Sequence, residues 1–229
     1  MTKRPLFFVR LARGAAWLGL ALLCLFVVLV ALYAFVPPVS TLMLARLVQG
    51  KSYARTYVPL EDVAPTVLEA VIASEDGGFC WNDGVDWGAL REVLSQAGKS
   101  GPSRGASTIT MQVARNLFLW PGRMAIRKGI EIAIALVLDK VWPKRRIMEI
   151  YLNIAEWGDG LYGVEAAAER YFHKKASQLG LGEAALLATA LPNPIKRNPA
   201  HPSALQRRLA ASLVERARLD GERTACLRR

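Results

Sequence analysis

Hydrophobic residues in this chain form one long uninterrupted run near the N-terminus and several shorter stretches with helical spacing. Residues 15–36 contain no charged side chain. As a helix rising about 1.5 Å per residue, this run reaches about 33 Å, enough to cross a hydrocarbon core of about 30 Å. It is also too long for the core of a typical signal peptide. We therefore predict an uncleaved transmembrane anchor at residues 15–36, between residues 1–14 and an outer part at residues 37–229.

In the outer part, hydrophobic residues recur at intervals of three and four, as on one face of a helix. One such stripe follows Pro65, a residue that suits the first turn of a helix. No stretch alternates between hydrophobic and polar residues as a half-buried strand does, so we predict an all-α fold. The predicted helices cover residues 40–48, 65–75, 87–96, 108–116, 145–153, 164–172, 182–191 and 203–219.

The charged residues around the predicted anchor indicate its orientation in the membrane. Four basic residues and no acidic residue precede it, and the first acidic residue of the chain is Glu61. The positive-inside rule therefore places the N-terminus in the cytoplasm and the outer part on the other side of the membrane. The outer part holds all 19 acidic residues and 26 of the 30 basic ones, a net charge of +7. Outside the membrane we expect no nucleic acid, so this charge favours anionic lipid head groups or a phosphorylated lipid.

The cysteines and histidines limit the metal and redox chemistry. Cys24 lies in the predicted anchor, whereas Cys80 and Cys226 lie in the outer part, where an oxidising compartment permits a disulfide. The sequence leaves open whether these two cysteines pair. The chain has only two histidines and no Cys or His residues at metal-ligand spacing, so we predict no structural metal site.

A polar face is predicted on the helix at residues 108–116. Thr108, Gln112 and Arg115 fall at positions i, i+4 and i+7, so one face would carry a hydroxyl, an amide and a guanidinium group. Such a face can bind a polar ligand.

Basic residues follow within about two helical turns. Arg123, Arg127 and Lys128 would join Arg115 around one region of space, and Glu131 follows Arg127 by one turn. Guanidinium and ammonium groups together suit a multiply charged anion such as a phosphate. The alternative is a solvated basic helix with an ordinary Arg127–Glu131 pair worth about 0.3 kcal/mol, and spacing does not separate the two. Because its neighbours are apolar, Glu131 must face a cleft or lie buried beside a cation.

Glu75 is the first candidate for proton transfer. It ends the helix at residues 65–75, just before Gly77 and Gly78. The negative end of the helix dipole and the neighbouring Asp76 should both raise the pKa of its carboxyl group. A carboxylate with a raised pKa suits general acid–base catalysis, although such pairs are often only a solvated helix end.

Several motifs together resemble a known family. They are Ala73-Ser-Glu-Asp-Gly-Gly-Phe79, Gly105-Ala-Ser-Thr-Ile-Thr-Met-Gln112, Arg127-Lys-Gly-Ile-Glu131, Ile150-Tyr-Leu-Asn153 and Glu183-Ala-Ala-Leu-Leu-Ala188. In this order and at this spacing, over about residues 55–200, they resemble the peptidoglycan glycosyltransferases that polymerise lipid II. The monofunctional biosynthetic transglycosylases are the most similar form, because the chain ends near Arg229 and contains no Ser-x-x-Lys motif of a transpeptidase domain.

The resemblance implies a lysozyme-like helical head, a smaller lobe that dips into the membrane, and one transmembrane helix in the cell inner membrane with a periplasmic catalytic domain. The implied reaction inverts the sugar carbon that carries the lipid pyrophosphate and releases undecaprenyl diphosphate. The implied partners are lipid II, the growing glycan chain, membrane lipids and other cell-wall synthesis or division proteins. No cofactor is required, although a divalent cation (Mg or Mn) can assist beside the pyrophosphate.

The resemblance also assigns roles to individual residues. Glu75 would be the general base that takes the proton from the acceptor 4-hydroxyl, and Glu131 would be a second essential glutamate that orients the neighbouring cations or helps to hold a divalent cation. Asp76 and Gln112 would position the reacting groups. The remaining residues that match substrate-binding positions are Phe79, Thr108, Arg115, Asn116, Arg123, Arg127 and Lys128.

Three residues depart from the family pattern. Asn82 stands where the family often has His, Ala106 replaces a Gly, and Met111 replaces a Gln. None of these changes removes a glutamate or a phosphate-binding cation. Asn in place of His at position 82 would change the hydrogen bonds expected near Glu75.

Two other functions agree with parts of the sequence. A lysozyme-like enzyme that cleaves peptidoglycan would use Glu75 as a general acid. Such an enzyme has no pyrophosphate to neutralise, so the basic cluster favours the transferase. An inactive membrane-anchored scaffold of the cell-wall machinery would need neither the glutamate nor the cations.

Overall fold

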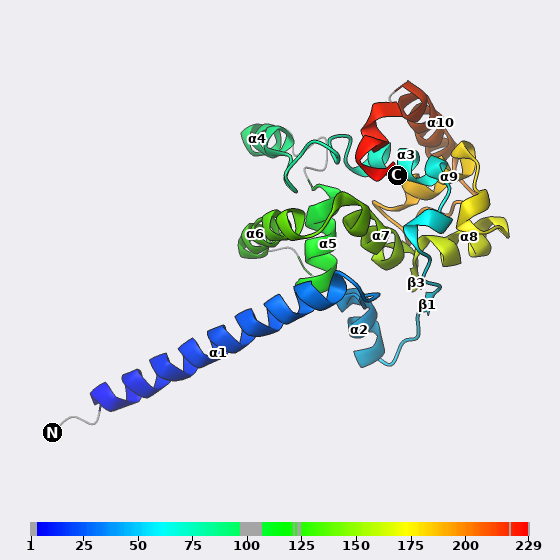
Figure 1. The fold of residues 1–229 in the computed structure, drawn as a ribbon. Helices are drawn as coiled ribbons and strands as arrows, with labels where there is room; N and C mark the ends of the chain where they lie inside the picture. The colour runs from blue at the N-terminus through cyan, green and yellow to red at the C-terminus, as the bar shows by residue number, and fades with distance from the viewer. Residues whose placement is uncertain (1–3, 97–106, 121, 123–124, 220, 229) are drawn as a thin grey trace. The chain divides into compact units, whose positions relative to one another are not determined.

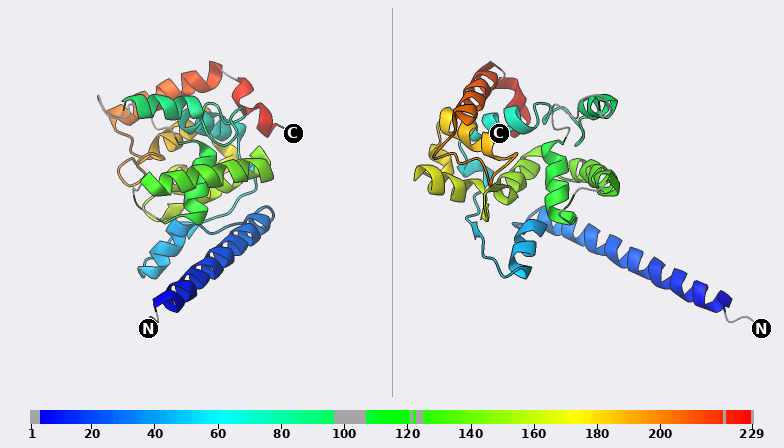
Figure 2. Two further views of the ribbon diagram at one scale, coloured as in Figure 1. Left: turned by 90° about the vertical axis from the view of Figure 1, so that its left-hand side faces the viewer. Right: turned by 180° about the vertical axis from the view of Figure 1, so that it is seen from behind.

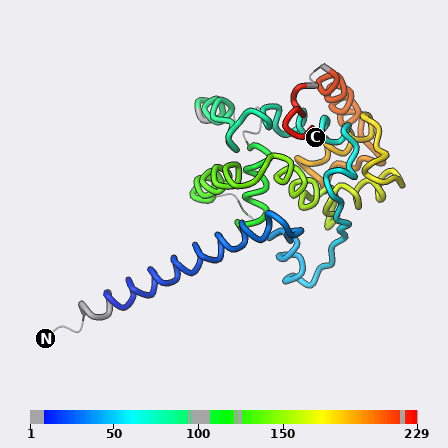
Figure 3. Tube along the Cα trace, viewed as in Figure 1, coloured from blue at the N-terminus to red at the C-terminus, as the bar shows by residue number. Residues whose placement is uncertain are grey.

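The computed structural model describes residues 4–96, 107–120, 122, 125–219 and 221–228. Its chain divides into two compact units, Met1–Pro37 and Pro38–Arg229. Figure 3 traces the path of the chain through both units. Arg123, part of the predicted basic cluster, and the motif residues Gly105 and Ala106 lie outside the described residues.

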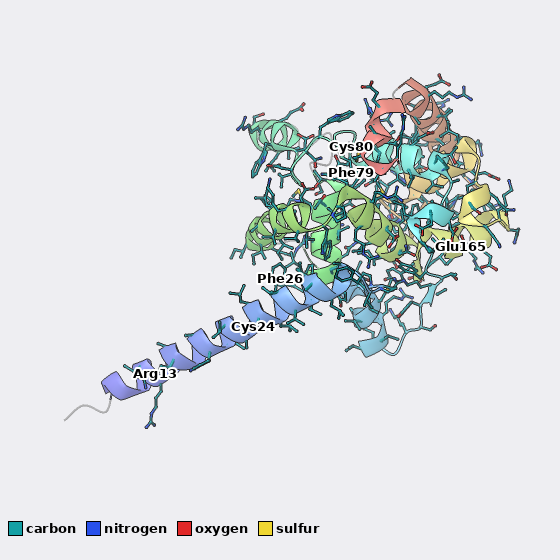
Figure 4. All side chains as sticks on the ribbon, viewed as in Figure 1. Arg13, Cys24, Phe26, Phe79, Cys80 and Glu165 are labelled. Carbon is teal, nitrogen blue, oxygen red and sulfur yellow. A yellow bond between two sulfur atoms is a disulfide. The ribbon has the colours of Figure 1, made fainter. Side chains whose placement is uncertain are left out.

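The first unit is the helix α1 (Arg4–Tyr33). It begins before the predicted anchor because the basic N-terminal residues continue the helix. Val9–Tyr33 is a 25-residue stretch with a mean hydropathy of 2.8, long and apolar enough to cross a membrane. Cys24 is free and exposed on this helix (Figure 4).

The second unit is mostly helical, as the hydrophobic spacing predicted, and Figure 1 shows the arrangement of its elements. Its α-helices are α2 (Thr41–Val48), α3 (Pro65–Glu75), α4 (Trp87–Gln96), α5 (Ile109–Phe118), α6 (Ala125–Val141), α7 (Lys144–Ile154), α8 (Val164–Phe172), α9 (Leu181–Ala190) and α10 (Ala204–Leu219). The short 3₁₀ helices are η1 (Leu60–Asp62), η2 (Ala176–Gln178) and η3 (Gly221–Leu227).

The helices pack as two groups joined by α7. One group contains α3, α9, α10 and η3, and the other contains α2, α5 and α6; α7 contacts α5, α6, α8 and η3. The two further views in Figure 2 show the same neighbours. The largest fully buried side chains are those of Trp157, Tyr151, Tyr162, Phe79 and Met43. Burying large apolar and aromatic side chains supplies most of the stabilisation of such a fold.

The sequence analysis predicted neither the short 3₁₀ helices nor a small sheet. β1 (Ala54–Arg55) pairs in parallel with β3 (Leu161–Tyr162), and β2 (Glu156–Gly158) pairs with β3 in antiparallel orientation. The strand order is β1-β3-β2. Strands of two and three residues are too short to show alternation, so the pattern could not reveal them.

The segment between α3 and α4 is fixed by a covalent bond and by close packing. A disulfide joins Cys80 to Cys226 in η3, which decides the pairing that the sequence left open. Cys80 and the buried Phe79 are labelled in Figure 4. Gly84 has a φ of +93°, and a Cβ atom at this position would lie 2.8 Å from the backbone oxygen of Ala135 in α6. The loop therefore approaches α6 as closely as only glycine permits.

We predict that Gly84→Ala destabilises the protein by about 2 kcal/mol or more, because it adds a methyl group where α6 leaves no room and forces an unfavourable φ. Chemical unfolding measured by circular dichroism tests this. Gly182→Ala in α9 is the control, because a Cβ atom there meets no other atom within 4 Å. A Gly84→Ala protein as stable as the control would contradict the close-packing argument.

Candidate active site

Glu75 is held at the end of α3 by two side chains. Its Oε2 atom accepts a hydrogen bond from Nε2 of Gln112 on α5 at 3.1 Å, and its Oε1 atom accepts one from Oγ of Ser74 at 3.0 Å. The helix starts at Pro65 and buries its apolar stripe against α9 and α10. This packing sets the position in which Glu75 meets α5.

The surroundings of Glu75 raise the pKa of its carboxyl group. Burial is the largest cause, and the hydrogen bonds from Gln112 and Ser74 and the charges of Arg115 and Arg197 lower this pKa in part. The direction is the one predicted, but the cause is burial and not the helix end or Asp76. A partly desolvated carboxylate with hydrogen bonds to its ionised form is suited to accept a proton.

Asp76 supports α5 and does not bond to Glu75. Its Oδ2 atom accepts a hydrogen bond from the backbone N–H of Ile109, the first residue of α5, at 3.0 Å, and its Oδ1 atom accepts one from Nδ2 of Asn82 at 2.9 Å. Burial raises the pKa of Asp76 to about 6. A carboxylate at a helix N-terminus interacts favourably with the free backbone N–H groups there. The hydrogen bond from Asn82 thus supplies a donor at the position where the family often has His.

Thr108 and Phe79, both predicted to bind substrate, make contacts within the fold. Thr108 is the N-cap of α5: its hydroxyl oxygen accepts a bond from the N–H of Met111 at 3.1 Å, and the hydroxyl donates to the backbone oxygen of Gly84 at 2.7 Å. Phe79 is completely buried, and the ammonium group of Lys144 lies 4.8 Å from its ring centre. Thr108 thus caps α5 and Phe79 belongs to the core, and their expected contact with a substrate stays a prediction.

A cavity of about 390 Å³ opens beside the other end of α5. Its polar lining comes from Arg115, Asn116 and Arg127, as the sequence analysis predicted for these side chains. Its remaining lining residues are Thr41, Leu42, Leu119, Trp120 and Gly122. The lining of the cavity thus combines two cationic side chains with apolar ones. Arg115 also lies close enough to Glu75 to lower its pKa, so it connects the glutamate with the cavity.

Glu131 holds two cations side by side. Its Oε2 atom lies 3.4 Å from Nη1 of Arg127, and its Oε1 atom lies 2.7 Å from Nζ of Lys128. Glu131 is 1% exposed, as expected for a carboxylate buried beside a cation. Lys128 also donates a hydrogen bond to Oγ of Ser107 at 2.8 Å. These contacts match the expected orienting role of Glu131.

Arg127 retains unused capacity to bind an anion. Its side chain is buried, and within the described residues its Nε atom has no hydrogen-bond partner. A buried N–H group without a partner is costly, so an acceptor supplied by a ligand in the adjacent cavity would be favourable.

The described residues do not form a divalent-cation site of their own. Among them, no three side chains of His, Cys, Asp or Glu lie together in a way that could hold a metal ion. Both oxygens of Glu131 are already engaged by Arg127 and Lys128.

The run Leu117-Phe-Leu-Trp120 is mainly core. Leu117 and Leu119 are 6% and 4% exposed, whereas Trp120 at the end is 48% exposed. Only Trp120 therefore presents a large apolar surface outward, next to the cavity that it lines.

Sequence reasoning missed Tyr151 and Arg197 as site residues. The Tyr151 hydroxyl lies 3.3 Å from Oε1 of Gln112, and Arg197, which follows α9, contributes to the potential at Glu75. Tyr151 belongs to the motif Ile150-Tyr-Leu-Asn153, which could have indicated it as a site residue. Arg197 gave none, because it is distant in sequence from every other site residue.

Known proteins resemble this chain over most of its length. The Transglycosylase family profile matches residues 41–217. A biosynthetic peptidoglycan transglycosylase of Agrobacterium fabrum is 50% identical over 222 residues, which cover 96% of this chain and 98% of the relative. Proteins of the same name from Brucella suis and Rhizobium meliloti are 51% and 47% identical, over 91% and 94% of this chain and 93% and 92% of their own. These matches show that the chain belongs to the transglycosylase family.

Proposed function

We propose that this protein polymerises lipid II into the glycan strands of peptidoglycan and releases undecaprenyl diphosphate. The observation that carries this proposal is the arrangement along α5: Gln112 holds the Glu75 carboxylate, and Arg115 lies between that carboxylate and the cationic cavity that contains Arg127. A proton acceptor and an anion site at neighbouring positions are what glycosyl transfer from a pyrophosphate requires.

Glu75 acts as the general base in this proposal. Its carboxylate takes the proton of the acceptor 4-hydroxyl while the hydroxyl oxygen forms a bond to C1 of the donor sugar. The bond from C1 to the pyrophosphate oxygen breaks, and the pyrophosphate leaves with the electron pair. Attack from the face opposite the leaving group inverts the configuration at C1.

The cations receive the charge that develops on the leaving group. Arg115 and Arg127 line the cavity, and Glu131 holds Lys128 beside Arg127. Fixed cations in a partly dehydrated site stabilise a developing anion without reorganising. The apolar lining residues Leu42, Leu119 and Trp120 suit a ligand that joins a pyrophosphate to a hydrocarbon chain.

The proposed location is the cell inner membrane, with α1 as a single anchor and the second unit in the periplasm. The basic residues before the anchor support a cytoplasmic N-terminus. The disulfide Cys80–Cys226 supports an oxidising compartment for the second unit. The helix α2 follows the anchor closely in sequence and exposes Leu44, Leu47 and Val48. These apolar side chains support contact of α2 with membrane lipids.

The comparisons also bear on the alternatives. The relatives are named biosynthetic enzymes, and the A. fabrum relative is matched over 98% of its length, which supports a monofunctional polymerase of similar size. A lysozyme-like hydrolase has no use for the buried cations around the cavity. A scaffold has no need of a desolvated glutamate. Partners among other cell-wall synthesis or division proteins stay an expectation.

Substitution of Glu75 tests the proposed base. Glu75→Gln keeps the shape of the side chain but cannot accept the proton, so we expect polymerisation to fall by at least about 100-fold. Purified protein given lipid II in detergent should yield glycan polymer and a lipid pyrophosphate, both measured by chromatography. Release of soluble muropeptides from intact sacculi would instead favour the hydrolase, and full activity of Glu75→Gln would exclude Glu75 as the base.

Substitution of Arg127 tests the proposed leaving-group site. Arg127→Lys keeps the charge but loses the planar guanidinium fork, so we expect about tenfold weaker binding of a short-chain polyprenyl diphosphate, measured by calorimetry. Arg208→Gln is the control, because Arg208 is exposed on α10 away from the cavity. Equal affinities of the Arg127→Lys and parent proteins would contradict the assigned site.

The pH dependence of activity tests the raised pKa of Glu75. Because burial raises the pKa of Glu75, activity should be lost as pH falls through a value above the ordinary carboxyl pKa of about 4.3. Arg115 and Arg197 both lower this pKa, so Arg115→Gln and Arg197→Gln should each move the acidic limb of the pH–rate profile to higher pH. Arg115→Lys keeps the charge and should leave the limb in place. An unchanged limb in both Gln variants would mean that another group titrates.

A further inference from the structure

Behind Glu75 lies a chain of two hydrogen bonds that ends at a buried phenol. Tyr151 on α7 is 1% exposed, and its hydroxyl group donates a bond of 3.3 Å to Oε1 of Gln112. The other end of the same amide, Nε2, donates the 3.1 Å bond to Oε2 of Glu75. Three helices, α3, α5 and α7, thus meet through one row of polar atoms.

The amide of Gln112 needs a group that sets its orientation. Its oxygen and nitrogen ends have nearly the same shape, so rotation by 180° exchanges an acceptor for a donor at each end. An ionised Glu75 accepts hydrogen bonds only, and the rotated amide would turn its oxygen towards that carboxylate. A donor placed at the far end of the amide favours the orientation in which Nε2 faces Glu75.

The Tyr151 hydroxyl remains such a donor over the working pH range. Burial, first, and the charge of Glu75 raise the pKa of Tyr151 well above its ordinary value, so the phenol keeps its proton. Other groups that act on Glu75 are Ser74 on its own helix, Arg115 on α5 and Arg197 after α9. None of these three is bonded to the Gln112 amide in the described structure.

We propose that Tyr151 is a positioning residue: its hydroxyl fixes the orientation of the Gln112 amide, and the amide in turn holds the Glu75 carboxylate ready for proton abstraction. This inference rests on the proposed role of Glu75 as the base. Tyr151 does not touch substrate in this arrangement, so its effect reaches the reaction only through Gln112.

Tyr151→Phe tests the proposal because it removes only the hydroxyl group. We expect kcat for lipid II polymerisation to fall about tenfold and KM to change less than twofold, since the bond affects the base and not the substrate site. The acidic limb of the pH–rate profile should move to higher pH, because the ionised carboxylate loses an oriented donor. Tyr162→Phe is the matched control: Tyr162 in β3 is equally buried and lies outside the row.

A double-mutant cycle separates positioning from general packing. If Tyr151 acts through Gln112, Tyr151→Phe should cause no further loss of kcat in a Gln112→Ala background. A purely structural role predicts that the two losses multiply. Multiplying losses, or an unshifted acidic limb in a folded Tyr151→Phe protein, would overturn the proposal.

A measurement without substrate distinguishes this proposal from the proposed function. The Glu75 carboxyl group can be titrated by ¹³C NMR in the full-length protein in detergent, with Glu75→Gln used to assign its signal. We expect Tyr151→Phe to raise the pKa of Glu75 and 3-fluorotyrosine at position 151, a stronger donor of nearly the same shape, to lower it. These shifts are expected whether or not the protein polymerises lipid II. Unchanged titration in both proteins would overturn the Tyr151 role and leave the proposed function untouched.

Discussion

The site depends on how α5 is anchored at its two ends. At the N-terminal end, Asp76 accepts a hydrogen bond from Ile109, and at the C-terminal end the Thr41 hydroxyl of α2 donates to the backbone oxygen of Leu119 at 2.8 Å. Free N–H and C=O groups at helix ends need such partners. Because Gln112 and Arg115 lie between these anchors, the positions of the proton acceptor and the anion cavity are set together by one short helix.

The two adjacent carboxylates of the site have different hydrogen-bond partners and different exposure. Glu75 and Asp76 are neighbours in sequence, yet one faces the amide of Gln112 and the other faces the backbone of α5. Desolvation raises the pKa of both carboxyl groups, but only Glu75 is partly exposed. Two adjacent carboxyl groups with similarly raised pKa values thus differ in accessibility: Asp76 is buried against α5, whereas Glu75, the proposed base, is partly exposed.

Much of the fold and part of the site followed from the sequence. The sequence analysis predicted the bounds of α2, α3, α4, α7, α8, α9 and α10 to within about one residue. Proline or glycine next to α3, α8 and α10 marked where these helices begin. Gln112, Arg115, Arg127 and Glu131 were found because helical periodicity places them together. The enclosure of the Phe79 ring in the core did not follow from the sequence, because it depends on tertiary packing. Tyr151 and Arg197 required the tertiary packing of α7 and of the segment after α9, which local patterns do not encode.

The bond between Cys80 and Cys226 spans 146 positions of the chain. Since a ribosome makes the chain from the N-terminus, Cys226 is made 146 residues after Cys80. The peptide that follows Glu75 therefore cannot be tied to η3 until that later segment has been made. The disulfide in this way links the folding of η3 to the neighbourhood of the Glu75 carboxylate.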